Sequence, residues 1–348
     1  MDMTVCTELR DAIHAQPPEG LRLALLNDWQ RDFPLVDEPF VAIGAACGCA
    51  ADAVLAQYQQ LLDDGAISRI GGIWGAGAGG AALLCAFAVP PDRLEAVAAL
   101  VSADPGVNHN YERENRHNLW FVITGRNAAA VARAVDGLEA LTGCRALRLR
   151  MRRAYRIDLG FDLRDDLAAR GQVTPQHVAP VADADAALAA LLEAGLPLVA
   201  RPYQAWADQL HCSAEDVRAT LQRWLRQGTL RRFGVIVRHH EVGFAANAMT
   251  VFDVPDALVD RCGDALATQP GVTLAYRRER AEGWPYNLYC MVHGRDRAAV
   301  HAAIEAAIAH SGLRAHPRAV LFSRRRFKQN GARYFRKLPD SATCHDAA

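Results

Sequence analysis

Residues 33–40 read FPLVDEPF, and residues 196–203 read LPLVARPY, 163 positions later. The same offset relates two further pairs of segments, and offsets of 165 and 169 relate four more, always in the same order. Such a repeated order, with small changes of offset, marks a duplicated unit that has gained short loop insertions. The chain of 348 residues is therefore a tandem duplication. The further pairs are 61–65 with 224–228, 69–71 with 232–234, 89–90 with 254–255, 105–107 with 270–272, 118–120 with 287–289, and 125–126 with 294–295.

Each copy begins with a helix-turn-helix pattern. Residues 50–63 and 213–226 place apolar side chains at helical spacing, and Ser213 is a good N-cap residue for the second of these helices. A preceding helix and a turn complete the motif, and Gly65 or Gly228 closes the second helix. A wing-like β segment comes next, so the pattern is that of a winged helix-turn-helix.

A region that alternates between strand and helix patterns follows in each copy. Its order is β-α-β-β-α-β, which is the ferredoxin-like split βαβ unit. The predicted fold class is therefore α+β, a tandem duplication of a winged helix-turn-helix plus a ferredoxin-like domain. The predicted elements are 81–89, 91–102, 107–113, 117–124, 126–142 and 145–151 in the first copy, and 246–254, 256–268, 272–278, 286–293, 295–311 and 317–323 in the second.

The repeats divide the chain into seven segments. The region between the copies is rich in Asp and Ala, so we expect a linker with a short helix at 184–194 and no chemistry. The predicted segments are an N-terminal extension (1–20), a helix-turn-helix domain (21–75) and a ferredoxin-like domain (76–156) of copy one, the linker (157–195), the corresponding domains of copy two (196–240 and 241–336), and a tail (337–348).

Composition narrows the class of protein. Nine cysteines without C-x-x-C spacing argue against a disulfide framework or a zinc knuckle. No apolar stretch approaches the roughly 18 residues of a spanning helix, and the first residues carry acids where a signal peptide carries bases, so we predict a cytoplasmic protein without a membrane partner. Residues 197–336 contain 21 Arg or Lys and 12 Asp or Glu, a balance of +9, which favours an anionic ligand.

A helix-turn-helix followed by a ferredoxin-like domain resembles the Lrp/AsnC family of transcription regulators, so DNA is the first partner to consider. A recognition helix needs polar side chains for the bases and Arg or Lys for the phosphates. The stretch 50–65 has no basic residue and three acids, and the second helix places Glu215 and Asp216 at the end that would enter the groove. These features argue against DNA, and a transcription regulator remains the alternative.

Two segments of the second copy carry a sharper resemblance. Residues 231–249 read RRFGVIVRHHEVGFAANAM, and residues 275–289 contain AYRRE and then WPYNLY. Both resemble the siroheme decarboxylase family, whose subunits share the Lrp/AsnC architecture. The first copy carries the partner version, with VNHNYER at 107–113 and HNLWF at 117–121. The resemblance covers nearly the whole chain, in the order of the fused D-L subunit of heme d1 biosynthesis.

The resemblance implies removal of CO2 from two acetate side chains of siroheme, which gives 12,18-didecarboxysiroheme. In the related alternative heme pathway, the same step leads toward heme b. No external cofactor is implied, because the iron tetrapyrrole is the substrate and its ring is the electron sink. The implied partners are homologous decarboxylase subunits or a second copy in a homodimer. A tetrapyrrole carrier or sensor without turnover is a further alternative.

Siroheme carries eight carboxylates, so its site needs several cations and neutral donors. An acetate clamped by Arg is stabilised as the anion, so we expect the clamps on the spectator groups. Each of these arginines can instead be a solvated surface residue without a ligand. Each tyrosine can instead be part of the packing of the sheet. The candidate substrate-binding residues are Arg231, Arg232, Arg238, Arg278, Tyr286, Tyr111, Arg113 and His117, with Arg324, Arg325 and Arg326 as weaker ones.

A proton must reach carbon to complete each methyl group, and the pKa of histidine suits this task near neutral pH. His239 and His240 are adjacent on a strand-like segment, so only one is expected to face the ligand. Copy one has the glycine run 71–80 at this place and no histidine, and that run lacks the context of a dinucleotide site. We therefore expect catalysis to be centred on copy two. The candidate catalytic residues are His239, His240, Tyr276 and His109, and His109 is also a candidate axial iron ligand.

Overall fold

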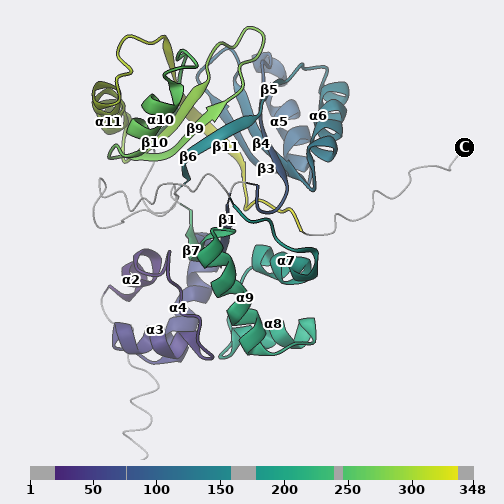
Figure 1. The fold of residues 1–348 in the computed structure, drawn as a ribbon, viewed down its shortest axis with the longest axis vertical. Coiled ribbons are helices and arrows are strands. Elements are labelled where there is room, and N and C mark those ends of the chain that lie inside the picture. The colour runs from purple at the N-terminus through teal and green to yellow at the C-terminus, as the bar shows by residue number, and fades with distance from the viewer. Residues whose placement is uncertain (1–19, 76, 158–177, 239–245, 336–348) are drawn as a thin grey trace, which may run out of the picture.

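The computed structural model describes residues 20–75, 77–157, 178–238 and 246–335. His239, His240, both ends of the chain and part of the predicted linker lie outside these ranges. The described residues form a helical layer and a sheet layer, which lie one below the other in Figure 1. Each layer combines the corresponding halves of the two copies, so the duplication folds as an internal pair.

The helical layer holds two equivalent three-helix units. Proline occupies the first turn of the middle helix in each unit, where its missing N–H has no intrahelical partner. The third helix of the second unit begins with a capping box from Ser213 and ends at Gly228 with φ +73°, as predicted. The elements are α2 (Leu21–Asn27), α3 (Pro39–Cys47), α4 (Ala51–Asp63) and β1 (Ile67–Trp74), then α7 (Ala186–Ala194), α8 (Pro202–Leu210), α9 (Ala214–Gln227) and β7 (Leu230–Val237).

Helix α7 lies within the predicted linker but packs as the first helix of the second unit. It contacts β1 and α8, and its Leu188 and Leu192 are buried in the core of the helical layer. The equivalent helix of the first unit is α2. We therefore propose that the second helical domain begins near residue 185 and not at residue 196.

Strands β1 and β7 join the two helical units in an antiparallel pair. Gly71 pairs with Gly234, its own equivalent in the other copy, so the approximate two-fold axis of the duplication passes through this pair. A Cβ on Gly234 would lie 2.4 Å from the Trp29 carbonyl oxygen, so only glycine fits there. The two wing-like segments therefore hydrogen-bond to each other.

The sheet layer contains both predicted ferredoxin-like units, and the predicted α+β fold class is confirmed. Helices α5 and α6 cover one side of the layer, and α10 and α11 cover the other (Figure 1). The first unit comprises β2 (Ala81–Phe87), α5 (Leu94–Ala103), β3 (Val107–Arg113), β4 (Leu119–Gly125), α6 (Ala128–Thr142) and β5 (Leu147–Leu149), followed by β6 (Met151–Ile157). The second comprises β8 (Ala246–Phe252), α10 (Val259–Ala267), β9 (Val272–Arg278), β10 (Leu288–Gly294), α11 (Arg297–His310) and β11 (Arg318–Gln329).

The last strand of each copy crosses into the sheet of the other. Strand β6 pairs with β9 of copy two, and β11 pairs with β8 through its first half and with β3 of copy one through its second half. The sheet order is β5-β2-β4-β3-β11-β8-β10-β9-β6. Because each copy completes the other's sheet, the two ferredoxin-like units form one body.

Alternate residues of the strands face two different cores. On β2, Cys85 and Phe87 pack under α5 and α6, whereas Leu84 and Ala86 face the sheet of the other copy. The parts of the nine-stranded sheet that belong to the two ferredoxin-like units enclose a common core. Side chains from both copies fill this core, including Trp120, Met249, Trp284, Tyr289 and Leu321. Residues on these inner faces can therefore form sites that use both copies.

Among the described residues, no single helix has the length and apolar character needed to cross a bilayer. Only α3 and α4 taken together meet those criteria, and the pair is bent by 98° at its break.

Candidate functional site

Two equivalent tyrosine–arginine pairs lie on the inner faces of the sheet layer. Tyr111 and Arg113 are on β3, and Tyr276 and Arg278 occupy the same positions on β9, 165 residues later. Residues two apart on a strand share a face, so each pair points the same way. The guanidinium carbon lies 5.5 Å from the ring centre of Tyr111 in the first pair and 5.1 Å from that of Tyr276 in the second. The structure thus brings these four predicted residues together in two pairs.

Each arginine of these pairs reaches across to the other copy. Arg113 Nη1 donates to the carbonyl oxygen of Leu321 at 3.2 Å, and Arg278 Nη1 donates to that of Leu149 at 2.9 Å. Leu321 and Leu149 are equivalent, because each pairs with the same position of its own first strand. Both guanidinium groups are therefore held at the junction of the two copies.

Neither arginine forms an ion pair with a carboxylate among the described residues. Arg113 is 6% exposed, and burial lowers its pKa to about 10, although the Tyr111 phenol opposes the shift. Burial likewise lowers the pKa of Arg278. Arg113 stays cationic at neutral pH, and a buried cation held only by neutral groups is stabilised by an incoming anion. These are the properties expected of a carboxylate clamp.

His109 extends the copy-one pair along β3. Its ring lies nearly parallel to that of Tyr111, with 6.2 Å between centres, and its Nδ1 lies 3.0 Å from Asn108 Oδ1. Burial, with a smaller contribution from Arg113, lowers the pKa of His109 to about 4. The imidazole is therefore neutral at neutral pH, and with Nδ1–H donated to the amide oxygen, Nε2 carries the lone pair. Such a ring can ligate iron but lacks the acidic proton of an imidazolium, so the axial-ligand hypothesis is favoured over the general-acid hypothesis.

Copy two contributes directly to the surroundings of Arg113. Asn247 on β8 accepts from Arg113 Nη1 at 3.4 Å and from Ser323 Oγ at 2.7 Å. The sulfur of Met291 lies 3.9 Å from Arg113 Nη2. We call His109, Tyr111, Arg113 and Asn247 the copy-one cluster. It combines residues of both copies, and segment 239–245, with His239 and His240, immediately precedes strand β8, which carries Asn247.

The copy-two cluster consists of Tyr276, Arg278 and Tyr289. Arg278 also lies over the Tyr289 ring, at 5.8 Å, and Leu274 occupies the position of His109. Burial raises the pKa of Tyr276 to about 12 and also raises that of Tyr111, so both phenols are neutral donors at neutral pH. Both clusters contain a tyrosine and an arginine, but only the copy-one cluster contains an imidazole.

His117 and Tyr286 were predicted on central strands, and this placement is wrong. Strands β4 and β10 begin at Leu119 and Leu288, so both residues lie in the hairpin connections before them. The connection of copy two is four residues longer, and Trp284 within it packs against both His117 (5.6 Å between ring centres) and Tyr286 (4.9 Å). Because this packing orders both connections, the strands need not extend through them.

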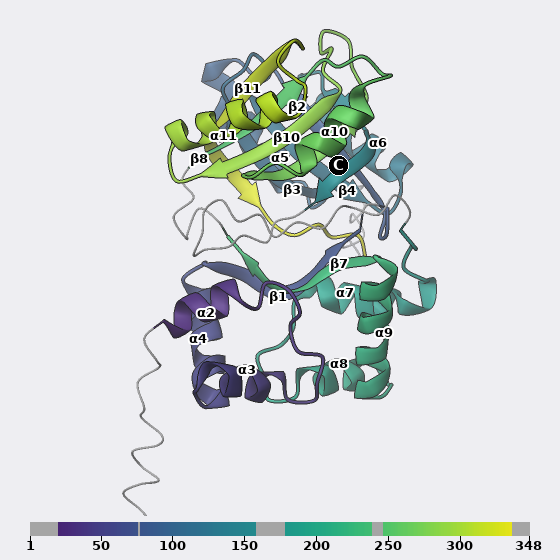
Figure 2. The same cartoon turned by 60° about the vertical axis from the view of Figure 1, so that its left-hand side comes forward.

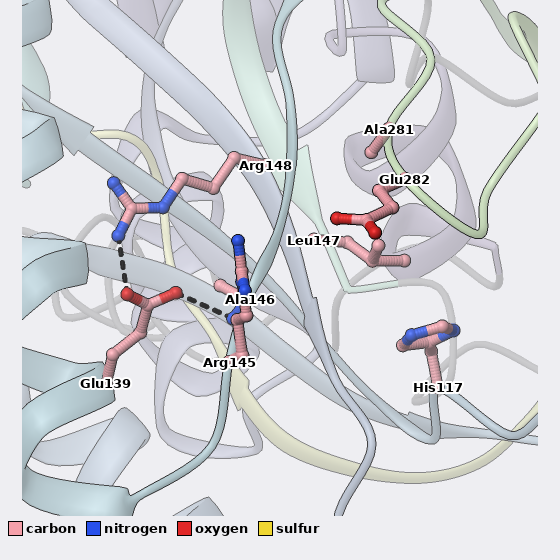
Figure 3. A pocket seen from close by; sticks show the side chains of 8 residues that line it. All are labelled: His117, Glu139, Arg145, Ala146, Leu147, Arg148, Ala281 and Glu282. Atoms are coloured by element: carbon pink, nitrogen blue, oxygen red, sulfur yellow. Dashed lines mark hydrogen bonds and ion pairs between the residues drawn. The ribbon is translucent and has the colours of Figure 1, made fainter.

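A pocket of about 450 Å³ lies where the copy-two hairpin meets copy one (Figure 3). Figure 3 shows Glu139 bonded to Arg148 on one side of the pocket. His117 and Glu282 lie on the other side. Arg148 also pairs with Asp136 at 2.6 Å, so its charge is already balanced. Burial lowers the pKa of His117, with the charge of Arg116 as a second cause. The lining combines acidic and basic side chains, and Arg148 is already paired with acids. We therefore regard this pocket as a weaker site for a polyanion than the surroundings of Arg113.

The remaining candidate arginines divide by their contacts. Arg232 is buried in the helical layer and donates to the Gln30 carbonyl oxygen at 2.7 Å, which is a structural contact. Arg231 is not without a partner. Arg238 is the last residue of its described range, and its backbone N–H donates to the Ala66 carbonyl oxygen. Two arginines of β11 pair with acids of copy one: Arg324 lies 3.8 Å from Glu112 and Glu114, and Arg325 pairs with Glu112 and Glu95. Arg326 donates to Gln329 on the same strand.

Two of the three arginines of α9 pair with acids. Arg218 pairs with Asp37 of the other copy, and Arg223 pairs with Asp185 at 2.6 Å. The wing strands are paired with each other. That DNA is not the partner stays a prediction.

Sequence reasoning missed several residues around the clusters. Asn247 and Trp284 stand inside the motifs that carry the resemblance, so their presence was visible but their role was not. Leu149 and Leu321 act through backbone oxygens, which leave no signal in side-chain patterns. Their partners follow only from the crossing of the last strands.

Known proteins match the whole of this arrangement. The siroheme decarboxylase NirDL-like HTH domain matches residues 23–67 and 185–231, and the AsnC-like ligand binding domain matches residues 78–156 and 241–328. The chain is 41% identical over 315 residues to the siroheme decarboxylase NirDL subunit of Paracoccus denitrificans (strain Pd 1222), over 90% of this chain and 97% of that relative. It is 50% identical over 145 residues to the NirL subunit of Stutzerimonas stutzeri, over 41% of this chain and 85% of that subunit.

A solved structure agrees with these relatives. The crystal structure of the siroheme decarboxylase NirDL in co-complex with an iron-uroporphyrin III analogue matches with a TM-score of 0.63 and 28% identity, over 91% of this chain and 94% of that one. Both copies, both layers and their order along the chain are thus shared with full-length relatives. The chain belongs to the siroheme decarboxylase family.

Proposed function

We propose that this chain is a siroheme decarboxylase, a carboxy-lyase that removes CO2 from two acetate side chains of siroheme and yields 12,18-didecarboxysiroheme for heme d1 biosynthesis. One observation carries the proposal. Arg113 is a buried cation with neutral partners among the described residues, and it stands on the same strand as a neutral imidazole. This combination suits an iron-bearing polyanion, and it has no evident use in a DNA-binding protein.

The copy-one cluster is the proposed place of the substrate. Arg113 binds a spectator carboxylate in place of the Leu321 carbonyl, and Tyr111 donates a hydrogen bond beside it. His109 offers Nε2 to the iron, while Asn108 holds the other ring nitrogen. Arg238, at the edge of the helical layer, is the proposed second clamp. These contacts orient the ring without pairing the reacting acetate.

The reacting acetate loses its carboxylate carbon as CO2 when the bond to the methylene carbon breaks. The electron pair of that bond stays with the methylene carbon and the conjugated ring, and one proton then completes the methyl group. No net electrons are transferred, so the step needs no external oxidant. We assign the proton to His239 or His240 in its imidazolium form, recharged from solvent, because His109 is neutral at working pH.

The proposed assembly includes homologous subunits. A shorter relative corresponds to about two fifths of this chain, so one copy alone is a natural unit of the family. The two copies here complete each other's sheets, and this chain therefore supplies internally the pairing that single-copy subunits would need from a partner. A further decarboxylase subunit or a second copy of this chain remains part of the proposal.

The test is to incubate the purified chain with iron-siroheme without oxygen and to follow the mass of the tetrapyrrole. Loss of two CO2 units is the expected result. A bound ligand of unchanged mass would indicate a carrier, and no binding together with a salt-sensitive shift of duplex DNA would indicate a regulator. Either of these outcomes contradicts the proposed function.

A further inference from the structure

After β11 ends, the chain crosses from the sheet layer to the helical layer. We call residues 330–335 the return segment, and Figure 2 shows this yellow segment passing between the two layers. At its start, the Asn330 N–H donates to the Asn108 carbonyl oxygen at 2.7 Å. Asn108 directly precedes His109 on β3, so the return segment begins beside the copy-one cluster.

Glu193 fixes the other end of the return segment to the helical layer. Its Oε1 accepts from the Tyr334 N–H at 2.8 Å and from Trp74 Nε1 at 3.1 Å, and its Oε2 accepts from the Phe335 N–H at 3.2 Å. Both oxygens of this buried side chain therefore accept N–H bonds. Three donors on one buried carboxylate make a strong anchor. This anchor lies in the region expected to be a linker without chemistry.

The glycine run of copy one supplies the seat for the two anchored aromatic residues. A Cβ on Gly79 would lie 2.8 Å from the Phe335 ring, and a Cβ on Gly80 would lie 2.8 Å from the Tyr334 ring. The Phe335 ring also packs on Trp74, with 5.4 Å between centres. The glycines that matched no phosphate-binding motif thus have a structural reason, which is to admit residues 334–335.

Asn108 connects the return segment to the imidazole of His109. Its carbonyl oxygen accepts from Asn330, and its side-chain oxygen lies 3.0 Å from His109 Nδ1. In the sheet, Gln329 stands opposite His109, directly before the return segment. An amide oxygen that accepts from Nδ1 fixes the orientation of the ring and leaves the lone pair on Nε2. The position of Asn108 therefore determines where that lone pair points.

Strand β11 is also held within the sheet layer, independently of Glu193. Lys328 Nζ donates to the carbonyl oxygens of Ser102 at 2.7 Å and of Asp104 at 2.9 Å, at the end of α5. Loosening the return segment should therefore leave the pairing of β11 in place and act on the residues beyond it.

The positions equivalent to the anchor and to the imidazole carry other groups. By the repeat offsets, a glutamine, a valine and a leucine take the places of the carboxylate, the indole and the imidazole. The three groups therefore occur as one set, and the equivalent set has none of them. The equivalent pairs are Glu193 with Gln30, Trp74 with Val237, and His109 with Leu274.

We propose that Glu193 is a positioning residue for the copy-one cluster. By fixing the return segment, it keeps Asn330 bonded to Asn108, and Asn108 in turn holds the His109 ring in the orientation that offers Nε2 to iron. The inference rests on the proposed function and deepens it, because it names the contacts that prepare the proposed iron ligand. Glu193 itself does not touch the substrate.

A matched pair of variants at Asn330 tests the hydrogen bond to Asn108. Asn330→Pro removes the backbone N–H, and Asn330→Ala, at an exposed side chain, keeps it and is the control. Iron uroporphyrin III, used as a probe without oxygen, is titrated and followed by absorbance. We expect Asn330→Pro to raise the Kd about 3-fold to 10-fold and to shift the visible bands, with Asn330→Ala within about 1.5-fold of wild type. Unchanged Kd and bands in Asn330→Pro would overturn the inference.

Glu193→Gln tests the anchor, because it places an amide N–H2 among N–H donors. We expect the Kd of the probe to rise about 3-fold to 10-fold in the wild-type background and less than about 1.5-fold when His109→Ala is already present. Equal losses in the two backgrounds would show a merely structural role and would contradict the positioning of His109. Glu305→Gln, the same change on an exposed helix, is the control and should leave the Kd unchanged.

Limited proteolysis shows directly whether the return segment is released. We expect trypsin to cleave after Arg333 about 10-fold faster in Glu193→Gln than in wild type, and an unchanged rate contradicts the anchor. Thermal unfolding checks the fold of each variant, and the Asn330 pair carries the test independently of Glu193. A wild type that binds the probe but releases no CO2 from iron-siroheme contradicts the proposed function alone, because the spectra report on His109 without turnover. A wild type that binds no probe contradicts both.

Discussion

The copy-one and copy-two clusters have the same tyrosine and arginine on equivalent strands, yet their surroundings differ. Around Arg113 stand His109 and the copy-two residue Asn247, whereas Arg278 has Leu274 and Tyr289 nearby. The tyrosine and the arginine are thus common to both clusters, whereas the side chains around them differ. A duplicated scaffold can keep its architecture through both copies while only one of the two equivalent positions retains a complete set of reactive groups.

The difference also changes an expectation from the sequence. Catalysis was expected to be centred on copy two, because the adjacent histidines are there. The contacts of Arg113 favour a composite site, in which copy one supplies the strand residues and copy two supplies Asn247. We therefore propose that the copies contribute different parts to a single site.

The largest expected effect concerns the proton donor. His239→Ala and His240→Ala, made separately, should leave binding of iron uroporphyrin III unchanged, and one of them should lower kcat about 100-fold to 10,000-fold, the usual range for a general acid. Stopped anaerobic reactions analysed by mass give the rates. Wild-type turnover in both variants would remove histidine from the mechanism.

The next largest effect separates the two arginines. Arg113→Gln should weaken binding of iron uroporphyrin III about 10-fold to 100-fold, because a charge-assisted hydrogen bond is worth roughly 1.5–3 kcal/mol. Arg278→Gln should change it less than about 3-fold, because Leu274 takes the place of the imidazole in the copy-two cluster. Arg318→Gln, at the start of β11 and paired with Glu305, is the surface control. Equal losses from both cluster arginines would contradict the assignment to one site.

A smaller effect is expected from the imidazole of copy one. His109→Ala should shift the visible absorption bands of the bound iron tetrapyrrole, because the axial ligand changes, and weaken binding by about 10-fold. Added imidazole should restore the wild-type bands. Identical spectra for the variant and the wild type would show that His109 does not ligate the iron.

A further effect, on the free energy of unfolding and not on binding or turnover, is expected at acid pH. The pKa of His109 is about 4 in the folded chain and 6.5 ordinarily, so the unfolded chain binds a proton that the folded chain excludes. Its contribution is present above about pH 6.5 and is lost as the pH falls toward 4, by at most about 3 kcal/mol. Urea unfolding at pH 7 and at pH 4.5 should show a smaller loss in His109→Gln than in wild type. Parallel losses would contradict the shift.

The sequence predicted most elements because their signals are local. Helices predicted at 50–63 and 213–226 were found at Ala51–Asp63 and Ala214–Gln227, and the strand predicted at 107–113 was found at those residues. Apolar spacing, the Ser213 cap and the closing glycines are all read from neighbouring residues. Tyr111, Arg113, Tyr276 and Arg278 were named as separate candidates, and their pairing appeared only in the structure.

The features that sequence reasoning missed depend on contacts between distant segments. Nothing in 151–157 shows that this strand pairs with β9, and nothing near Glu193 shows that residues 334–335 return to it. His117 and Tyr286 were misplaced because Trp284 orders the hairpins in which they lie. His239 and His240 lie outside the described residues, so their role remains a prediction.

A crystal structure of the chain with iron uroporphyrin III tests the central claim most directly. The account predicts a ring at the copy-one cluster, with a carboxylate on Arg113 and the iron facing Nε2 of His109. A ring bound only against Arg278, with Arg113 still on the Leu321 carbonyl oxygen, would contradict it.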